Sequence, residues 1–203
     1  MPEEGLLQQT LQIFEDGGPL MLPLALLTVV IYYAVISLYL ELFMRRFDRA
    51  DENLWRHWID MPDEAEGELG EVIRYASANY TSVDRLRACF NEIRTDYIPR
   101  INTRIRFATV LVSTAPLAGL LGTVTGMLTT FNGLAASAGS STASLVAGGI
   151  AEALITTMTG LVIAIPGYVL ISRIKVMRAS LELFFLRLEN AFIRKSLPRR
   201  AAA

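Results

Sequence analysis

Positive charge is missing from most of this chain. All 19 lysines and arginines lie in two blocks, residues 45–106 and 173–200, while the formal net charge of the 203 residues is only −1. A net charge this close to zero gives no general attraction to nucleic acid. We therefore expect no nucleic-acid partner. Cysteine and histidine are also scarce, since the chain has one cysteine, Cys89, and one histidine, His57. A lone cysteine excludes an internal disulfide, and a lone histidine with no cysteine beside it argues against a metal site.

Enzyme signatures are absent as well. The sequence contains no phosphate-binding loop, no nucleophile motif and no metal-ligand spacing. The longest charged region, residues 44–106, is short and irregular for a catalytic domain. We therefore predict that the chain is not an enzyme and needs no cofactor.

What the sequence does have is three long, mainly apolar segments with very few charged residues. A bilayer core of about 30 Å takes roughly 20 apolar residues in a helix, and residues 18–43, 107–134 and 145–172 meet that length. The first is not a cleavable signal peptide, because no basic residue precedes it. The alternative is a soluble bundle of three buried helices, but core helices of this length usually keep a polar face.

The basic residues predict the orientation of these segments. Arginines and lysines follow the first segment, precede the second and follow the third. By the positive-inside rule, these three flanks lie in the cytoplasm and the N-terminus lies outside. The expected order is a periplasmic amphipathic helix (1–17), transmembrane helix 1 (18–43), a cytoplasmic helical insert (44–106), transmembrane helix 2 (107–134), a periplasmic loop (135–144), transmembrane helix 3 (145–172) and a cytoplasmic C-terminal helix (173–203).

Helical periodicity extends beyond the apolar segments. Residues 2–16 carry leucine and phenylalanine at helical spacing, which is typical of a helix lying on the membrane surface. Apolar residues recur in the same way from Val83 to Ile105 and from Leu181 to Ile193, with Pro99 as an interruption. The predicted fold is an all-α membrane protein of three transmembrane helices with long cytoplasmic helical extensions.

One charged residue, Glu152, lies inside an apolar segment. Ionisable groups at membrane depth are costly and indicate a functional site. The alternative is that Glu152, which is near the outer end of the segment, lies at the headgroup boundary and merely caps the N-terminus of the third helix, which the helix dipole would favour. At 100° per residue, Thr156 and Thr159 share a face with Glu152, whereas Thr157 lies on another face. The sequence therefore predicts a polar row on this helix.

The second segment carries a hydroxyl row and a row of small residues. Thr123 belongs to a seven-residue repeat of polar positions, and Gly119, Gly122 and Gly126 follow helical spacing. Small residues let transmembrane helices approach closely. Threonines in helices also bond to their own backbone carbonyls, so the hydroxyl rows alone leave a polar path between the helices unproven.

Two motifs are similar to a known family. Residues 121–127 read Leu-Gly-Thr-Val-Thr-Gly-Met, and residues 149–166 contain Gly-Ile-Ala-Glu-Ala-Leu followed by Thr, Gly-Leu and Ala-Ile-Pro. In order and spacing they closely resemble the MotA/TolQ/ExbB proton-channel family, in its ExbB/TolQ branch. Thr125 and Gly148 depart from the common pattern, which weakens assignment to a subfamily.

The resemblance implies roles for particular residues. Its pore threonines fall on Thr123 and Thr157, and its third-span glutamate falls on Glu152. The proton-pathway candidates are therefore Thr123, Glu152, Thr156, Thr157 and Thr159. The candidates for helix packing are Gly119, Gly122, Gly126, Gly160 and Pro166.

The resemblance also implies partners and a cellular role. We expect a homopentamer in the bacterial inner membrane, with an ExbD/TolR-like single-span protein inside its pore and a TonB/TolA-like protein beyond it. Protons would be the coupling ion, and the work would energise outer-membrane transport. The alternatives are a TolQ-like role in envelope constriction and, in a different class, a passive membrane scaffold.

Overall fold

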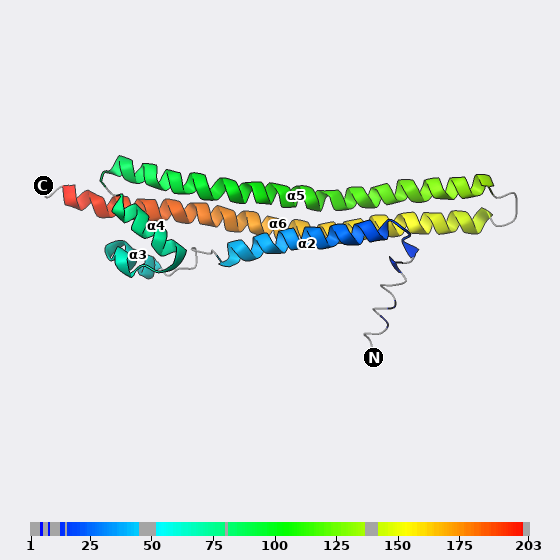
Figure 1. Ribbon diagram of the computed structural model, residues 1–203, viewed down its shortest axis with the longest axis horizontal. Coiled ribbons are helices and arrows are strands. Elements are labelled where there is room, and N and C mark those ends of the chain that lie inside the picture. Colours follow the sequence, from blue (N-terminus) through cyan, green and yellow to red (C-terminus); the bar gives the residue numbers. More distant parts are fainter. Residues whose placement is uncertain are drawn as a thin grey trace. The chain divides into compact units, whose positions relative to one another are not determined.

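The computed structural model describes residues 5, 8, 13–14, 16–44, 52–79, 81–136 and 142–200. All regular structure in these residues is helical, which confirms the predicted all-α class. The elements are α2 (Met21–Met44), α3 (Glu52–Asp60), η2 (Pro62–Glu64), α4 (Gly67–Ala78), α5 (Val83–Ala136) and α6 (Thr142–Arg200) (Figure 1). Among the described residues, α2, α5 and α6 are long and apolar enough to cross a membrane.

The predicted helical extensions are confirmed. Helix α5 has 54 residues and α6 has 59, so each is far longer than the roughly 20 residues that a membrane requires. Helix α5 begins at Val83, well before the apolar segment that starts at Phe107, and it continues through Pro99. Helix α6 likewise continues past Ile171 to Arg200.

Two predicted segments fall largely or partly outside the described residues. Of the amphipathic helix predicted over 1–17, Ile13 and Phe14 are helical and exposed. Of the loop predicted over 135–144, residues 137–141 lie outside the described part of the chain. Helix α5 ends at Ala136 on one side of them, and α6 begins at Thr142 on the other.

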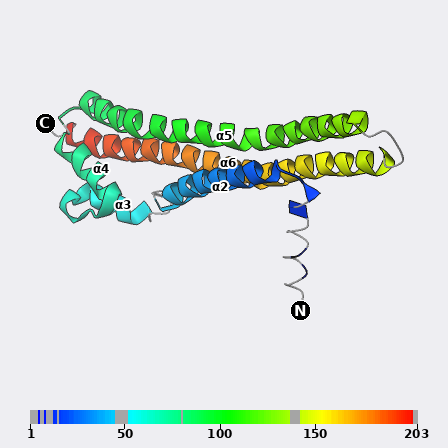
Figure 2. The same ribbon diagram turned by 45° about the vertical axis from the view of Figure 1, so that its right-hand side comes forward.

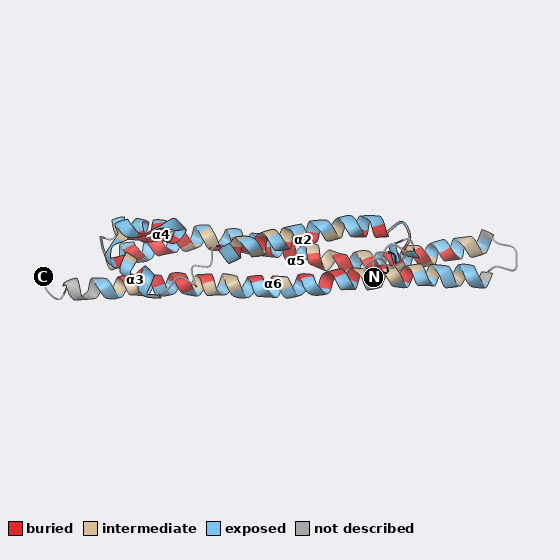
Figure 3. Ribbon diagram, turned by 90° about the horizontal axis from the view of Figure 1, so that it is seen from below, coloured by how far each residue is buried: buried red, intermediate tan, exposed pale blue. Residues whose placement is uncertain are grey.

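The chain divides into two compact units. The first, here called the membrane unit, comprises Met1–Ser37 and Phe107–Ile171. The second, here called the charged unit, comprises Leu38–Arg106 and Ser172–Ala203. Figure 3 marks the buried residues, which recur along one side of the helices within each unit.

In the membrane unit, the buried residues are aliphatic and small. Ile31 and Val35 of α2 are fully buried, as are Val112 and Ala115 of α5. The hydroxyl of Tyr32 donates a hydrogen bond to the Ile163 carbonyl at 3.2 Å, which ties α2 to α6. Large apolar side chains cover the outside of this unit, and several are more than half exposed: Leu22, Leu26, Val29, Phe107, Leu117, Leu121, Leu154, Val162 and Ile165.

The charged unit has an aromatic core. Phe90 and Phe185 are fully buried, and Phe90 lies 5.7 Å from Phe192 between ring centroids. Trp55 of α3 meets Phe184 of α6 edge to face at 6.1 Å. Figures 1 and 2 both show α3 and α4 beside the C-terminal part of α6. Ion pairs join the elements around this core, among them Arg94 with Glu189 at 3.0 Å, Lys195 with Asp60 at 2.7 Å, and Arg104 with Glu41.

Candidate functional site

Glycines bring α5 and α6 into close contact in the membrane unit. A Cβ atom added to Gly119 would lie 2.9 Å from the Thr156 carbonyl oxygen, and one added to Gly160 would lie 2.6 Å from the Ala115 carbonyl oxygen. At Gly126 the nearest atom would be the Ala153 Cβ at 3.3 Å. At Gly119 and Gly160 these distances leave no room for a larger side chain, and at Gly126 the fit would be tight. The two backbones therefore approach as small-residue interfaces allow in lipid.

Thr157 joins the two helices by a hydrogen bond. Its hydroxyl donates to the Gly119 carbonyl at 3.0 Å, and the contact is partly buried. A hydroxyl on α6 can reach a backbone carbonyl of α5 only because Gly119 keeps the helices close. Such bonds between helices add to the packing that holds membrane helices together. Of the predicted proton-pathway hydroxyls, Thr157 is thus placed at the α5–α6 contact.

Thr156 lies at the same contact but bonds within its own helix. The residue is 2% exposed and its hydroxyl donates to the Ala153 carbonyl at 2.9 Å. Its side chain packs against Gly122 of α5, where an added Cβ would lie 2.6 Å from the Thr156 Cβ. This hydroxyl proton is already engaged, yet the oxygen retains capacity to accept.

Thr159 and Thr123 also bond back to their own helices. Thr159 donates to the Ile155 carbonyl at 2.8 Å, and Thr123 donates to the Leu120 carbonyl at 2.7 Å. Both residues are partly exposed in the single chain. Pro166, a predicted packing residue, is exposed, and α6 continues through it. Within the described part of the chain, the hydroxyls of Thr123 and Thr159 therefore make no hydrogen bond across the α5–α6 contact.

Glu152 lies about three turns inside α6. The helix begins at Thr142, ten residues earlier, which at 1.5 Å per residue is about 15 Å along the axis. The effect of the helix dipole falls off within the first turn. The distance of Glu152 from Thr142 therefore argues against capping of the first turn of α6.

The carboxylate of Glu152 lies against Gly18, in the turn that precedes α2. A Cβ atom added to Gly18 would overlap the Glu152 carboxylate. Gly18 also has a φ of +70°, which side chains other than glycine rarely adopt. Sequence reasoning missed this contact. The available signal was the Gly17-Gly18 pair directly before the first apolar segment.

The structure thus separates the predicted site residues into two groups. Thr156 and Thr157 meet the glycines of α5, whereas Glu152 meets the turn before α2. The face shared by Glu152 and Thr156 in the sequence prediction is therefore divided between two neighbouring segments. Among the described residues, no group of three His, Cys, Asp or Glu side chains could hold a metal ion.

Three helices are long and apolar enough to span a bilayer, which defines the class as a multi-pass helical membrane protein. Its α6 carries the Glu152 carboxylate beside the turn before α2 and the Thr157 hydroxyl that bonds to α5. Comparison with known families gives the particular group. The family model of the MotA/TolQ/ExbB proton channel family matches residues 65–184, more than half of the chain, and the chain belongs to this family.

Individual relatives point to its ExbB and TolQ members. The chain is 43% identical over 67 residues to the biopolymer transport protein exbB1 of Vibrio cholerae, a match that covers 33% of this chain and 29% of that protein. It is 28% identical over 182 residues to the putative biopolymer transport protein ExbB-like 1 of Synechocystis, covering 81% and 71%. It is 42% identical over 74 residues to the Tol-Pal system protein TolQ of Pseudomonas aeruginosa, covering 36% and 32%. The predicted membership of the ExbB/TolQ branch is confirmed.

Proposed function

We propose that this chain is a wall subunit of a proton channel that converts the proton motive force into mechanical work. The observation that carries the proposal is the position of Glu152, three turns inside α6 and against Gly18, in a chain of a proton channel family. An ionisable side chain within an apolar helix is costly and indicates a functional site. The role involves no making or breaking of covalent bonds.

The available energy is sufficient for work. One elementary charge that crosses the membrane yields about 2.3 kcal/mol per 100 mV of potential. Several protons per cycle therefore supply an amount comparable to the stability of a small domain, about 5–15 kcal/mol. Glu152 and the hydroxyls of Thr123, Thr156, Thr157 and Thr159 are the groups through which this chain would act on protons.

The proposal includes an assembly. The exposed apolar surfaces of α5 and α6, which include Leu117, Leu121, Leu154 and Val162, need lipid or other protein helices to cover them. We propose a homopentamer around a lumen, with an ExbD/TolR-like single-span partner inside. A TonB/TolA-like protein would carry the force to the outer membrane. The names of the relatives in biopolymer transport and Tol-Pal systems support partners of this kind.

The proposed location is the bacterial inner membrane. The basic residues that flank the three apolar segments support a cytoplasmic charged unit and a periplasmic N-terminus, by the positive-inside rule. The C-terminal end of α6 would then also be cytoplasmic.

A TolQ-like role in envelope constriction is the second candidate. It is favoured by the 42% identity to the Pseudomonas aeruginosa protein, which is close to the 43% identity to the Vibrio cholerae protein. The passive scaffold is weaker, since it relied on Glu152 as a helix cap and the carboxylate lies beyond the first turn of α6.

The test measures proton uptake by vesicles that hold the full chain with its co-purified single-span partner. Glu152→Gln removes the titratable group and keeps the shape, so uptake should fall to the level of empty vesicles. Glu71→Gln is the matched control, because Glu71 is an exposed carboxylate in the charged unit. Wild-type uptake by an assembled Glu152→Gln complex would refute the channel proposal. Identification of the partner then separates the ExbB-like role from the TolQ-like one.

A further inference from the structure

A basic cavity lies between α5 and α6 in the charged unit. It has a volume of about 510 Å³ and is lined by Asn102, Ile105, Arg106, Lys175 and Arg178. Three of these five residues are cations and none is acidic.

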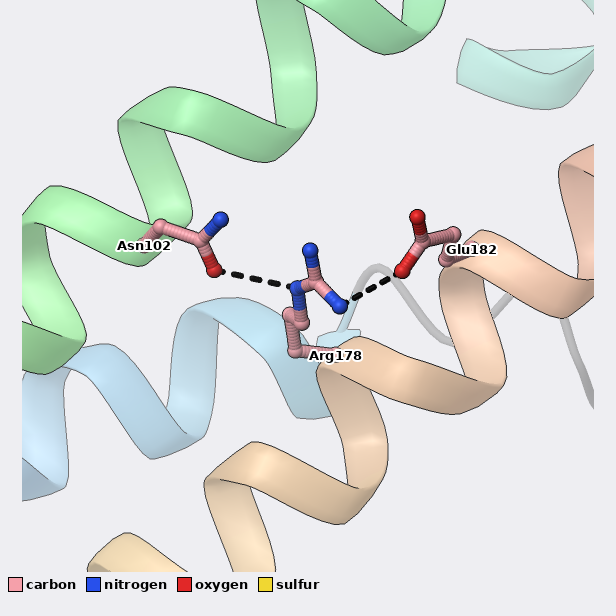
Figure 4. Close-up of polar contacts among 3 residues, drawn as sticks. All are labelled: Asn102, Arg178 and Glu182. Atoms are coloured by element: carbon pink, nitrogen blue, oxygen red, sulfur yellow. Dashed lines mark hydrogen bonds and ion pairs between the residues drawn. The ribbon is translucent and has the colours of Figure 1, made fainter.

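Arg178 is held in place at the wall of this cavity. Its Nε donates to the Asn102 side-chain oxygen at 3.0 Å, and its terminal nitrogen donates to a Glu182 carboxylate oxygen at 2.5 Å (Figure 4). The first bond crosses from α6 to α5, and the second stays within α6. The guanidinium is therefore fixed in orientation while Glu182 balances its charge.

Arg106 and Lys175 provide the charge that is not balanced. Both are exposed, and within the described part of the chain neither has a hydrogen-bond or ion-pair partner. Two cations without partners in a concave site favour the binding of an anion. A guanidinium beside an ammonium suits a phosphate, which accepts charge-assisted hydrogen bonds from both.

The position along the helices indicates where that phosphate comes from. Arg106 directly precedes the apolar segment of α5, and Lys175 comes four residues after Ile171, the last residue of the membrane unit. At 1.5 Å per residue, Lys175 is about 6 Å beyond that end. The headgroup layer on each side of the hydrocarbon core is about 5–8 Å thick. Both cations are thus at the depth of lipid headgroups.

We propose that this cavity binds the phosphate headgroup of an anionic phospholipid in the leaflet at the basic ends of the membrane helices. Basic pockets between transmembrane helices at such a boundary bind anionic headgroups. Arg106 and Lys175 contact the phosphate, Arg178 orients it, and Ile105 provides an apolar wall toward the hydrocarbon. The site contains neither Glu152 nor any of the proposed proton-pathway hydroxyls, so it is independent of proton conduction.

The test compares lipid retention by the purified full chain with native mass spectrometry. Vesicles of phosphatidylglycerol and phosphatidylcholine in equal amounts serve as the source of lipid. The wild-type chain should retain phosphatidylglycerol preferentially. Removal of one cation by Arg106→Gln should weaken the preference about fivefold, and removal of both by Arg106→Gln with Lys175→Gln about thirtyfold.

A matched double variant tests whether position matters or only net charge. Arg187→Gln with Arg194→Gln removes two exposed cations from α6 further from the apolar segment. It should retain the wild-type preference. Arg106→Lys with Lys175→Arg keeps the charge and should also retain most of it, and circular dichroism checks that each variant is helical. Equal losses in the two Gln double variants, or no loss in either, would overturn the proposal.

A competition arm distinguishes the lipid from a soluble anion. Excess inorganic phosphate should leave most of the phosphatidylglycerol bound, since the lipid also gains contacts through its acyl chains. If inorganic phosphate displaces the lipid completely at low excess, the site is one for a soluble anion and the lipid assignment is wrong.

Discussion

The two units of this chain solve the same packing problem with different residues. In the membrane unit, α5 and α6 meet through Gly119, Gly160 and the backbone atoms beside them. In the charged unit, the same two helices enclose Phe90 and Phe185, both fully buried. One pair of helices therefore has a contact of small residues along one part of its length and a contact of aromatic rings along another.

The difference follows from the surrounding solvent. In lipid no hydrophobic force draws helices together, so association depends on close backbone contact and on hydrogen bonds such as that from Thr157 to Gly119. In water, burial of large apolar side chains stabilises the structure by roughly 25 cal/mol per Å². Each unit uses the type of contact that contributes most in its own solvent.

The outer surfaces differ in the same direction. Leu117 and Leu154 of the membrane unit are each 64% exposed, a proportion that would favour aggregation of a protein in water. The outer faces of the charged unit carry ion pairs instead, for example Arg100 with Asp96 at 2.8 Å. Three substitutions and one labelling experiment test this comparison, beginning with the largest expected effect.

Phe185→Ala should cause the greatest loss of stability. The side chain is fully buried, and removal of a buried phenylalanine ring costs about 3–5 kcal/mol. Urea unfolding of the purified chain, followed by the fluorescence of Trp55 and Trp58, measures it. Leu186→Ala is the control, since Leu186 is 38% exposed and should change stability by no more than about 0.5 kcal/mol. Equal effects would show that the aromatic core is not the main source of stability in the charged unit.

Gly119→Ala should weaken the membrane unit by about 1–3 kcal/mol, because the added methyl meets the α6 backbone and forces the helices apart. Thermal unfolding in lipid nanodiscs provides the measurement. Gly133→Ala makes the same chemical change on the same helix where no atom lies within 4 Å of the added Cβ. A Gly133→Ala chain that loses as much stability as Gly119→Ala would remove the case for a close α5–α6 contact.

Thr157→Val should cost about 0.6 kcal/mol, the usual value of a hydrogen bond between membrane helices. The change preserves the shape of the side chain and removes the donor to the Gly119 carbonyl. Thr159→Val removes a hydroxyl that bonds only within α6 and should cost less. The same nanodisc assay compares the two variants. A larger loss in Thr159→Val would contradict the assigned role of the bond between helices.

The smallest expected effect concerns the thiol of Cys89. Burial raises its pKa, and the nearby Glu92 carboxylate raises it further. At mildly alkaline pH the folded chain should therefore contain less thiolate than the unfolded chain and should be alkylated more slowly. The contribution of the protonated thiol to stability is present below the unfolded pKa and is lost as pH rises through the folded pKa. Iodoacetamide labelling across pH in native and urea-unfolded protein measures this, and equal rates would contradict it.

The sequence was informative about elements and poor about contacts between them. The scarcity of charge over residues 107–134 and 145–172, where Glu152 is the one charged residue, was sufficient to predict the membrane segments, and apolar spacing predicted the helices beyond them. Both signals are local, so one sequence reveals them. The contact of Glu152 with Gly18 joins segments far apart in the chain, and no local pattern reports it.

The threonines illustrate the same limit. A helical wheel grouped Thr156 with Glu152 correctly by angle, but an angle does not say which neighbour each side chain meets. In the structure Thr156 contacts α5 and Glu152 contacts the turn before α2. The hydrogen-bond partner of Thr157 also could not be predicted from the sequence. Its acceptor is a backbone carbonyl, and every residue has one.

The space at Gly18 has a consequence for how this chain can change by mutation. A substitution at position 18 meets both the φ of +70° and the Glu152 carboxylate, so single replacements there should be selected against. A shorter side chain at position 152 would relieve the overlap and leave the backbone requirement. Second-site suppressors of Gly18→Ala should therefore arise at position 152. Any such pair would relieve the steric overlap but would lose or displace the Glu152 carboxylate.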